Sequence, residues 1–236
     1  MKQIVLWLLL FPVLVFAQNV KTFIPEKAKP LIPVFKSEGE RLMPDLPYQE
    51  YFIALAEHES CISLKHSRCM SPTSELKSAR EQGVGLSQIT RAYNPDGTIR
   101  FDSLEDLRKR HMAELKALSW ETVKFQPELQ IRGLILMTRD NWKGFWQVPD
   151  LHARGHFTDA AYNGGKRGVD KERLQCGLTK GCDPKLWFDN VEKVCLKSRK
   201  PLYSGRSACD INRHHVHDVF DNRMPKYKPF FVDTQS

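Results

Sequence analysis

Apolar positions recur at helical spacing in several parts of this 236-residue chain, and they show no convincing strand alternation. The clearest helix is expected to begin near Tyr48, and one face of it collects four apolar residues, Phe52, Leu55, Ala56 and Ile62. Glu59 lies inside that apolar stripe, whereas Glu57 points to the opposite side. A carboxylate is therefore expected where the helix otherwise buries hydrocarbon.

Three more helices follow from caps and apolar spacing. Ser103 suits the N-cap of one of them, and Pro127 suits the first turn of the next. A short helix over residues 158–163 is stopped by the glycine pair after it. Residues 63–82 are polar and predict a loop. The fold class expected is mostly α.

The two ends of the chain differ from its helical middle, residues 48–195. Residues 18–47 carry five prolines, which predicts an extended arm because that spacing forbids a long helix. Residues 196–236 are basic and rich in Tyr, Pro and His, which predicts an irregular tail. The histidines of this tail match no trusted zinc spacing, so no metal is expected, only surface histidines: His214, His215 and His217.

Residues 1–17 have the pattern of a secretory signal. Lys2 precedes a short apolar run from Ile4 to Phe16, and Ala17 fits the small-residue rule for cleavage before Gln18. The run is short for a membrane span, which needs about 20 residues. We expect an exported protein that is periplasmic or associated with the cell wall. An uncleaved N-terminal anchor is the alternative.

Six cysteines follow the signal, and an even count in an exported chain predicts disulfides. We expect local pairs: Cys61–Cys69, Cys176–Cys182 and Cys195–Cys209. Reduced thiols or a metal site are the alternative. The formal net charge of +8 favours anionic surfaces. The basic residues are scattered and not striped with aromatic residues, so no nucleic-acid partner is expected; the cell wall, membrane headgroups or a merely solvated surface remain.

Glu59 is the first candidate for chemistry. A carboxylate on an apolar face is costly unless it is protonated or partnered, and a carboxyl group kept protonated near neutral pH can act as a general acid. Cleavage of a glycosidic bond needs such a proton, and most glycosidases also use a second carboxylate. No second one stands out, because Glu57 faces the wrong way and Glu81 falls in the predicted loop.

Three short motifs occur in order, and they are Ala54-Leu55 with Glu59-Ser60, Gly83-Val84-Gly85-Leu86-Ser87-Gln88-Ile89, and Ala161-Tyr162-Asn163-Gly164-Gly165. Over residues 46–170 the chain thereby resembles the soluble, Slt-type lytic transglycosylases, relatives of goose-type lysozyme. The resemblance implies a lysozyme-like catalytic domain in which Glu59 first donates a proton and later removes one. The sugar's own 6-hydroxyl then closes a 1,6-anhydro ring. No cofactor is implied.

The resemblance also implies roles for four other residues. Ser60, Gln88, Tyr162 and Asn163 would contact the substrate, and the Tyr162 hydroxyl would point toward Glu59. Simpler interpretations remain open: a serine bonding its own helix backbone, a tight glycine turn and a tyrosine packed in the core.

The chain departs from the family pattern in several places. Ser87 stands where the family usually has Met, an insertion is expected between residues 92 and 125, and the later Glu-Thr and Tyr-Val elements have no clean match. Trp142, Trp146 and Trp187 could stack on sugar rings, but the helical spacing of the first two favours the core.

We therefore expect a monomeric peptidoglycan lytic transglycosylase that cleaves the MurNAc–GlcNAc β-1,4 link. Its partners would be glycan strands, and a secretion or phage machine that needs a local opening of the wall is a second candidate partner. Three alternatives stay open: a hydrolytic muramidase or endolysin of the same fold, a non-catalytic wall-binding module, and a small secreted disulfide protein in which the motifs are coincidental.

Overall fold

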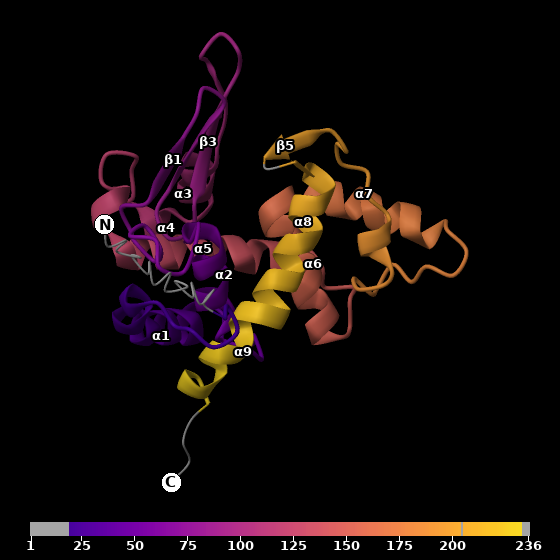
Figure 1. Cartoon of the computed structure of the whole chain (residues 1–236), viewed down its shortest axis with the longest axis horizontal. Coiled ribbons are helices and arrows are strands. Elements are labelled where there is room, and N and C mark those ends of the chain that lie inside the picture. Colours follow the sequence, from indigo (N-terminus) through magenta and orange to yellow (C-terminus); the bar gives the residue numbers. More distant parts are fainter. Residues whose placement is uncertain (1–18, 204, 233–236) are drawn as a thin grey trace, which may run out of the picture.

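A computed structural model describes residues 19–203 and 205–232 of the chain, so the predicted signal over residues 1–17 lies outside the described part. The described part is mostly helical and carries a small antiparallel sheet (Figure 1). Its larger helices are α1 (Ile32–Leu42), α2 (Tyr51–Ser60), α3 (Ser103–Arg110), α5 (Pro127–Lys143), α6 (Leu151–Gly164), α7 (Lys166–Gly177) and α8 (Ala208–His217). The shorter helical elements are η1 (Glu26–Leu31), α4 (Met112–Leu115), η2 (Val123–Phe125), η3 (Val191–Lys193), the π-helical turn η4 (Asp218–Arg223), α9 (Met224–Tyr227) and η5 (Lys228–Phe230).

Helix α2 runs through the centre of the core. Six consecutive side chains, from Tyr51 to Ala56, are buried, because α1, α5, η4 and α9 all pack on the helix. A helix buried all round needs no single apolar stripe. The stripe expected from the sequence is therefore only part of the buried surface, and Ile62, its last member, lies beyond the helix and is 65% exposed.

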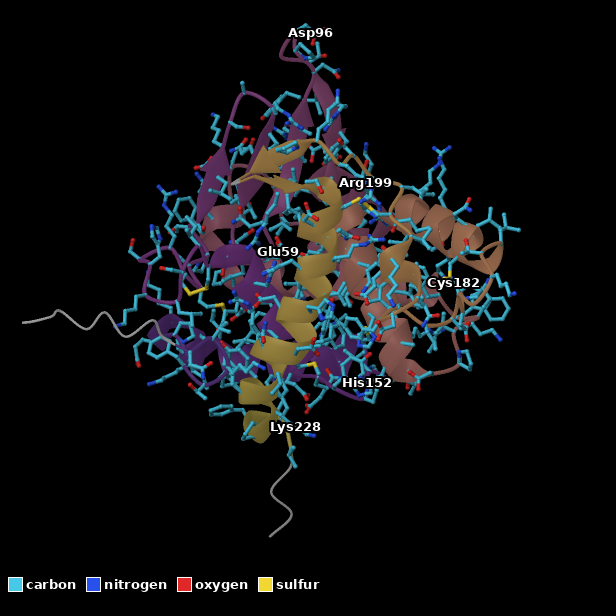
Figure 2. All side chains as sticks on the ribbon, turned by 45° about the vertical axis from the view of Figure 1, so that its right-hand side comes forward. Glu59, Asp96, His152, Cys182, Arg199 and Lys228 are labelled. Atoms are coloured by element: carbon cyan, nitrogen blue, oxygen red, sulfur yellow. A yellow bond between two sulfur atoms is a disulfide. The ribbon has the colours of Figure 1, made fainter. Side chains whose placement is uncertain are left out.

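The sheet was not expected from the sequence. Its strands β1 (Glu75–Lys77), β2 (Glu81–Val84), β3 (Ile89–Tyr93) and β4 (Ile99–Asp102) form an antiparallel meander in that order. The predicted loop over residues 63–82 is thus wrong for β1 and for the start of β2. The strands are three to five residues long, β1 and β4 have no buried residue, and β2 and β3 bury two residues each. They therefore lack the apolar alternation that marks a half-buried strand. The β3–β4 turn projects from the body of the molecule, with Asp96 at its tip (Figure 2).

The extended arm predicted for residues 18–47 is wrong, because α1 occupies much of this segment. Pro33 lies in the first turn of α1, where a missing N–H costs nothing. Pro44 lies two positions after the last helical residue, Leu42. Phe35 and Leu42 are buried, so α1 is part of the core and packs on α5. The prolines bound the helix and do not interrupt it.

The irregular tail predicted for residues 196–236 is also wrong. A short hairpin of β5 (Pro201–Tyr203) and β6 (Arg206–Ser207) leads into α8, η4 and α9. The side chains of Ser207 and Asp210 form a capping box that starts α8. Pro225 and Pro229 lie in first turns. Helix α8 packs on α6, and η4 and α9 pack on α2, so this segment covers the middle of the molecule (Figure 1).

All three expected disulfides are present: Cys61–Cys69, Cys176–Cys182 and Cys195–Cys209. Three disulfides are consistent with an exported protein. Among the described residues, no helix is long and apolar enough to cross a membrane. The helix prediction at Pro127 is confirmed by α5, whereas the helix near Ser103 is capped by the neighbouring Asp102, whose carboxylate accepts from the Glu105 amide.

Candidate catalytic site

A cleft of about 840 Å³ lies where the sheet, α2 and the end of α6 meet. Leu76 of β1 and Phe101 of β4 line it from the sheet, and Tyr162 and Asn163 line it from α6. Glu59, in the last turn of α2, also lines the cleft, and its side chain is 17% exposed. Figure 2 labels Glu59 at the centre of the molecule, beside α8. The carboxylate is therefore accessible to a ligand but largely enclosed.

The Glu59 carboxylate is the end of a chain of hydrogen bonds that crosses three helices. Its Oε1 atom lies 2.8 Å from Nε2 of His215 in α8. The other ring nitrogen of His215, Nδ1, lies 2.7 Å from Oδ2 of Asp159 in α6. Asp159 also accepts, through Oδ1, the hydroxyl proton of Tyr51 at 2.8 Å. Glu59 thus has a partner, which resolves the cost of a carboxylate on a helix packed in the core.

The imidazole of His215 is only 1% exposed, yet the structure favours its charged form. Burial by itself opposes the charge, but the carboxylates of Asp159 and Glu59 outweigh burial and raise the pKa of His215 to about 10. Both ring nitrogens then donate, one to each carboxylate. The prediction that His215 is a surface histidine is wrong, because α8 is folded against α2 and α6.

A second histidine, His58, lies against the first, with ring centroids 4.2 Å apart. Its burial and the nearby charge of His215 lower the pKa of His58, although its bond to Asp218 opposes that effect. The Nδ1 atom of His58 lies 2.7 Å from Oδ2 of Asp218. His58 is therefore expected to be neutral at pH 7, and the positive charge of this histidine pair resides on His215.

Tyr162 lines the same cleft as Glu59, but its hydroxyl is not bonded to Glu59, toward which the resemblance expected it to point. It donates to the backbone carbonyl of Ser87 at 3.1 Å. Burial first, and then the charges of Glu59 and Asp159, raise the pKa of Tyr162 well above its ordinary value. The hydroxyl therefore stays protonated and fixes the Ser87 turn against α6.

The glycines of the second motif make room for two glutamines. Gly85 has a φ of 78°, and a Cβ there would lie 2.2 Å from Oε1 of Gln130. A Cβ at Gly83 would lie 2.8 Å from Oε1 of Gln88. Gln88 lines the cleft and donates from Nε2 to the Gly85 carbonyl at 2.9 Å. Its own Oε1 has no hydrogen-bond donor within residues 19–203 and 205–232.

Asn163 and Ser60 differ in their access to the cleft. Asn163 lines it, and its Oδ1 accepts from Nδ2 of Asn212 at 3.1 Å, which holds α8 against the end of α6. Ser60 is buried and is not among the cleft residues. Its hydroxyl donates to the Ala56 carbonyl at 2.7 Å and accepts from the Met70 amide at 3.1 Å. Ser60 therefore orders the chain after α2.

The two other carboxylates, Glu57 and Glu81, differ in their relation to the cleft. Glu57 points away from the cleft, as expected, and is fully buried. Glu81 lies in β2, not in a loop, and lines the same cleft as Glu59.

Trp142 is in the core as expected, but Trp146 is 69% exposed, so the core prediction is wrong for it. No tryptophan of the described chain lines this cleft.

Sequence reasoning missed His215 and Asp159. A signal for His215 was present, because Asn212, His215, Val216 and Val219 follow the helical spacing of a buried face after the Ser207 cap. Asp159 lies one turn before Tyr162 but carries no pattern of its own. Within the described residues, no group of three or more His, Cys, Asp or Glu side chains is arranged to hold a metal ion.

No protein-family model matches this chain, and a search of curated proteins finds no match.

Proposed function

We propose that this protein is a peptidoglycan lytic transglycosylase with a lysozyme-like domain, and that it cleaves the MurNAc–GlcNAc β-1,4 link to leave 1,6-anhydro-MurNAc ends. One observation carries the proposal. Residues from three separate motifs, represented by Glu59, Gln88 and Tyr162, line or border a single cleft. Coincidental strings spread over more than 100 positions would have no reason to meet there.

The mechanism follows from one enclosed carboxyl group. Protonated Glu59 would give its proton to the glycosidic oxygen as the leaving sugar departs, and an oxocarbenium-like centre would form. The resulting carboxylate would then take the proton of the MurNAc 6-hydroxyl as that oxygen attacks the anomeric carbon. The proton count is restored within one turnover, so the same residue serves as acid and then as base.

The cleft also offers groups for holding a glycan. Leu76 and Phe101 present apolar surface that suits the faces of sugar rings. Gln88 has an acceptor oxygen that gains a partner if the side chain turns toward a sugar hydroxyl or acetamido N–H. The side chains that would bind substrate are thus Gln88, Tyr162 and Asn163, whereas Ser60 would support them from the interior.

The test is incubation of the protein with purified sacculi and mass analysis of the soluble products. We expect anhydro-muropeptides from the parent, and a loss of at least about 100-fold in rate for Glu59→Gln, which keeps the shape but cannot transfer the proton. Glu128→Gln, a change at an exposed site outside the cleft, is the matched control. Equal rates for Glu59→Gln and the parent would refute the mechanism.

A hydrolytic muramidase is the second candidate function. It is supported by the position of Glu81, which lines the same cleft as Glu59. Two carboxylates in one cleft, Glu59 and Glu81, are what hydrolysis with an activated water or a covalent intermediate requires. Muropeptides with reducing ends, and a rate loss for Glu81→Gln comparable with that for Glu59→Gln, would establish the muramidase. Anhydro products and a small effect of Glu81→Gln would exclude it.

A further inference from the structure

We propose that Asp159 and His215 are positioning residues that hold the catalytic proton for Glu59 between turnovers. In the resting protein the proton would reside on Nε2 of His215, and it would pass to Oε1 of Glu59 when a glycan strand fills the cleft. This inference rests on the proposed function of the cleft.

The geometry supplies a direct path for that proton. Nε2 of His215 lies 2.8 Å from Oε1 of Glu59, and Nδ1 lies 2.7 Å from Oδ2 of Asp159. The bond to Asp159 fixes the ring orientation and keeps a proton on Nδ1, so Nε2 must face Glu59. Tyr51 donates to the other oxygen of Asp159 and holds that carboxylate in place. Asp159 and His215 are both sealed from solvent, whereas Glu59 reaches the cleft.

The two carboxylates that face His215 favour a proton on its ring, and the neighbouring ring of His58 opposes a second positive charge. Helix α2 contributes Glu59 and the ring of His58, and α6 contributes Asp159. Asp218 of η4 engages His58. The pKa of His58 is lowered and that of His215 is raised to about 10, so one imidazolium lies between two carboxylates.

The transfer conserves protons. At rest, His215 is doubly protonated and Glu59 and Asp159 are carboxylates, for a net charge of −1. The N–H bond at Nε2 breaks as an O–H bond forms at Oε1, which leaves a neutral imidazole with its remaining proton on Nδ1. Glu59 then protonates the leaving oxygen, removes the 6-hydroxyl proton in the next step and returns it to Nε2. The exclusion of water by a bound glycan favours the neutral pair, because separated charges lose solvation.

The first test measures the protonation of the His215 ring directly and does not depend on enzymatic activity. The full chain is labelled with ¹⁵N in its histidine rings, and the His215 signals are assigned by their loss in His215→Gln. We expect both ring nitrogens of His215 to be protonated at pH 7. Asp159→Asn should lower the titration midpoint by more than about one pH unit, because a neutral amide removes one supporting charge. The control His217→Gln changes an exposed residue of the same helix and should leave the titration midpoint of His215 unchanged.

The second test reads catalysis on sacculi. His215→Gln keeps a hydrogen-bond donor for Glu59 but cannot carry a mobile proton. We expect kcat to fall at least about 100-fold with little change in KM. In Asp159→Asn, the alkaline limb of the kcat profile should move to lower pH. If His215 had only a structural role, the hydrogen-bond donor in His215→Gln would preserve kcat, and Asp159→Asn would not shift the alkaline limb of the pH profile.

The outcomes separate this inference from the proposed function. A His215 ring with one proton at pH 7, or a His215→Gln variant within about threefold of the parent kcat at every pH, overturns the inference and leaves the transglycosylase proposal standing. Absence of any glycan cleavage by the parent protein overturns the proposed function instead. If His215→Gln does not fold, the isosteric Asp159→Asn variant carries both readouts.

Discussion

His215 Nε2 and Glu59 Oε1 lie 2.8 Å apart, although 156 positions separate the two residues in the chain. The contact joins α8 to the last turn of α2. Glu59 therefore has its histidine partner only when the segment after residue 196 is folded onto the core.

The disulfide Cys195–Cys209 should matter for activity more than for stability alone. It closes a loop of 14 positions and holds the start of α8. Replacing both cysteines by serine should cost about 3 kcal/mol in the free energy of unfolding and should also lower the rate on sacculi, because α8 positions His215. The same change at Cys176–Cys182, a loop of 6 positions, should cost about 2 kcal/mol and leave the rate nearly unchanged at a temperature where both variants are folded.

Stability should fall as the pH rises through the alkaline range. Folded His215 keeps its proton up to a pKa of about 10, whereas the unfolded residue releases its proton near pH 6.5. The stabilising contribution is therefore complete below about pH 6.5 and is lost between there and about pH 10. Urea unfolding of the parent at pH 6 and pH 9.5 should show this decline, and His215→Gln should show a smaller one. An equal decline in both proteins would contradict the prediction.

The buried carboxylate of Glu57 should make Lys226 a strong determinant of stability. Nζ of Lys226 lies 2.7 Å from Oε1 of Glu57, and Arg223 and Tyr227 bond the same carboxylate. Lys226→Met should cost about 3–5 kcal/mol, because one partner of a buried pair is removed. The control Lys228→Met alters an exposed lysine two positions away and should be nearly neutral. A double change of Lys226→Met with Glu57→Gln should recover part of the loss.

Phe101 should contribute to glycan binding and not to chemistry. It lines the cleft and is 41% exposed, so a bound sugar can cover its ring. Phe101→Ala should raise KM about five- to tenfold, equivalent to about 1 kcal/mol of lost apolar burial, with kcat little changed. Ile99→Ala, on the same strand but outside the cleft lining, is the matched control. A fall in kcat with constant KM would instead place Phe101 at the reacting centre.

The features that could be predicted from the sequence depend on residues close to one another in the chain. The disulfide pairs are close in the chain, so short loop closure brings each pair together. Pro127 starts α5 because its fixed φ suits a first turn. Glu59 could be singled out because a carboxylate among apolar helix positions conflicts with the cost of burying charge. Each of these conclusions depends on neighbours within a few residues.

The elements that the sequence did not reveal depend on distant packing. The four strands β1 to β4 are short and carry no apolar alternation, and pairing with one another is what makes them strands. The proline-rich N-terminal segment becomes helical where α5 covers it. In both places tertiary contacts outweighed local propensity.

By itself the sequence determined a mostly α chain, three local disulfides and an acidic residue that required protonation or a partner. Only the tertiary structure decided which of these Glu59 has, because His215 and Asp159 come from α8 and α6 and meet it through packing. The electrostatic energy of a buried carboxylate depends on charges a few ångströms away in space, and distance along the chain does not reveal them.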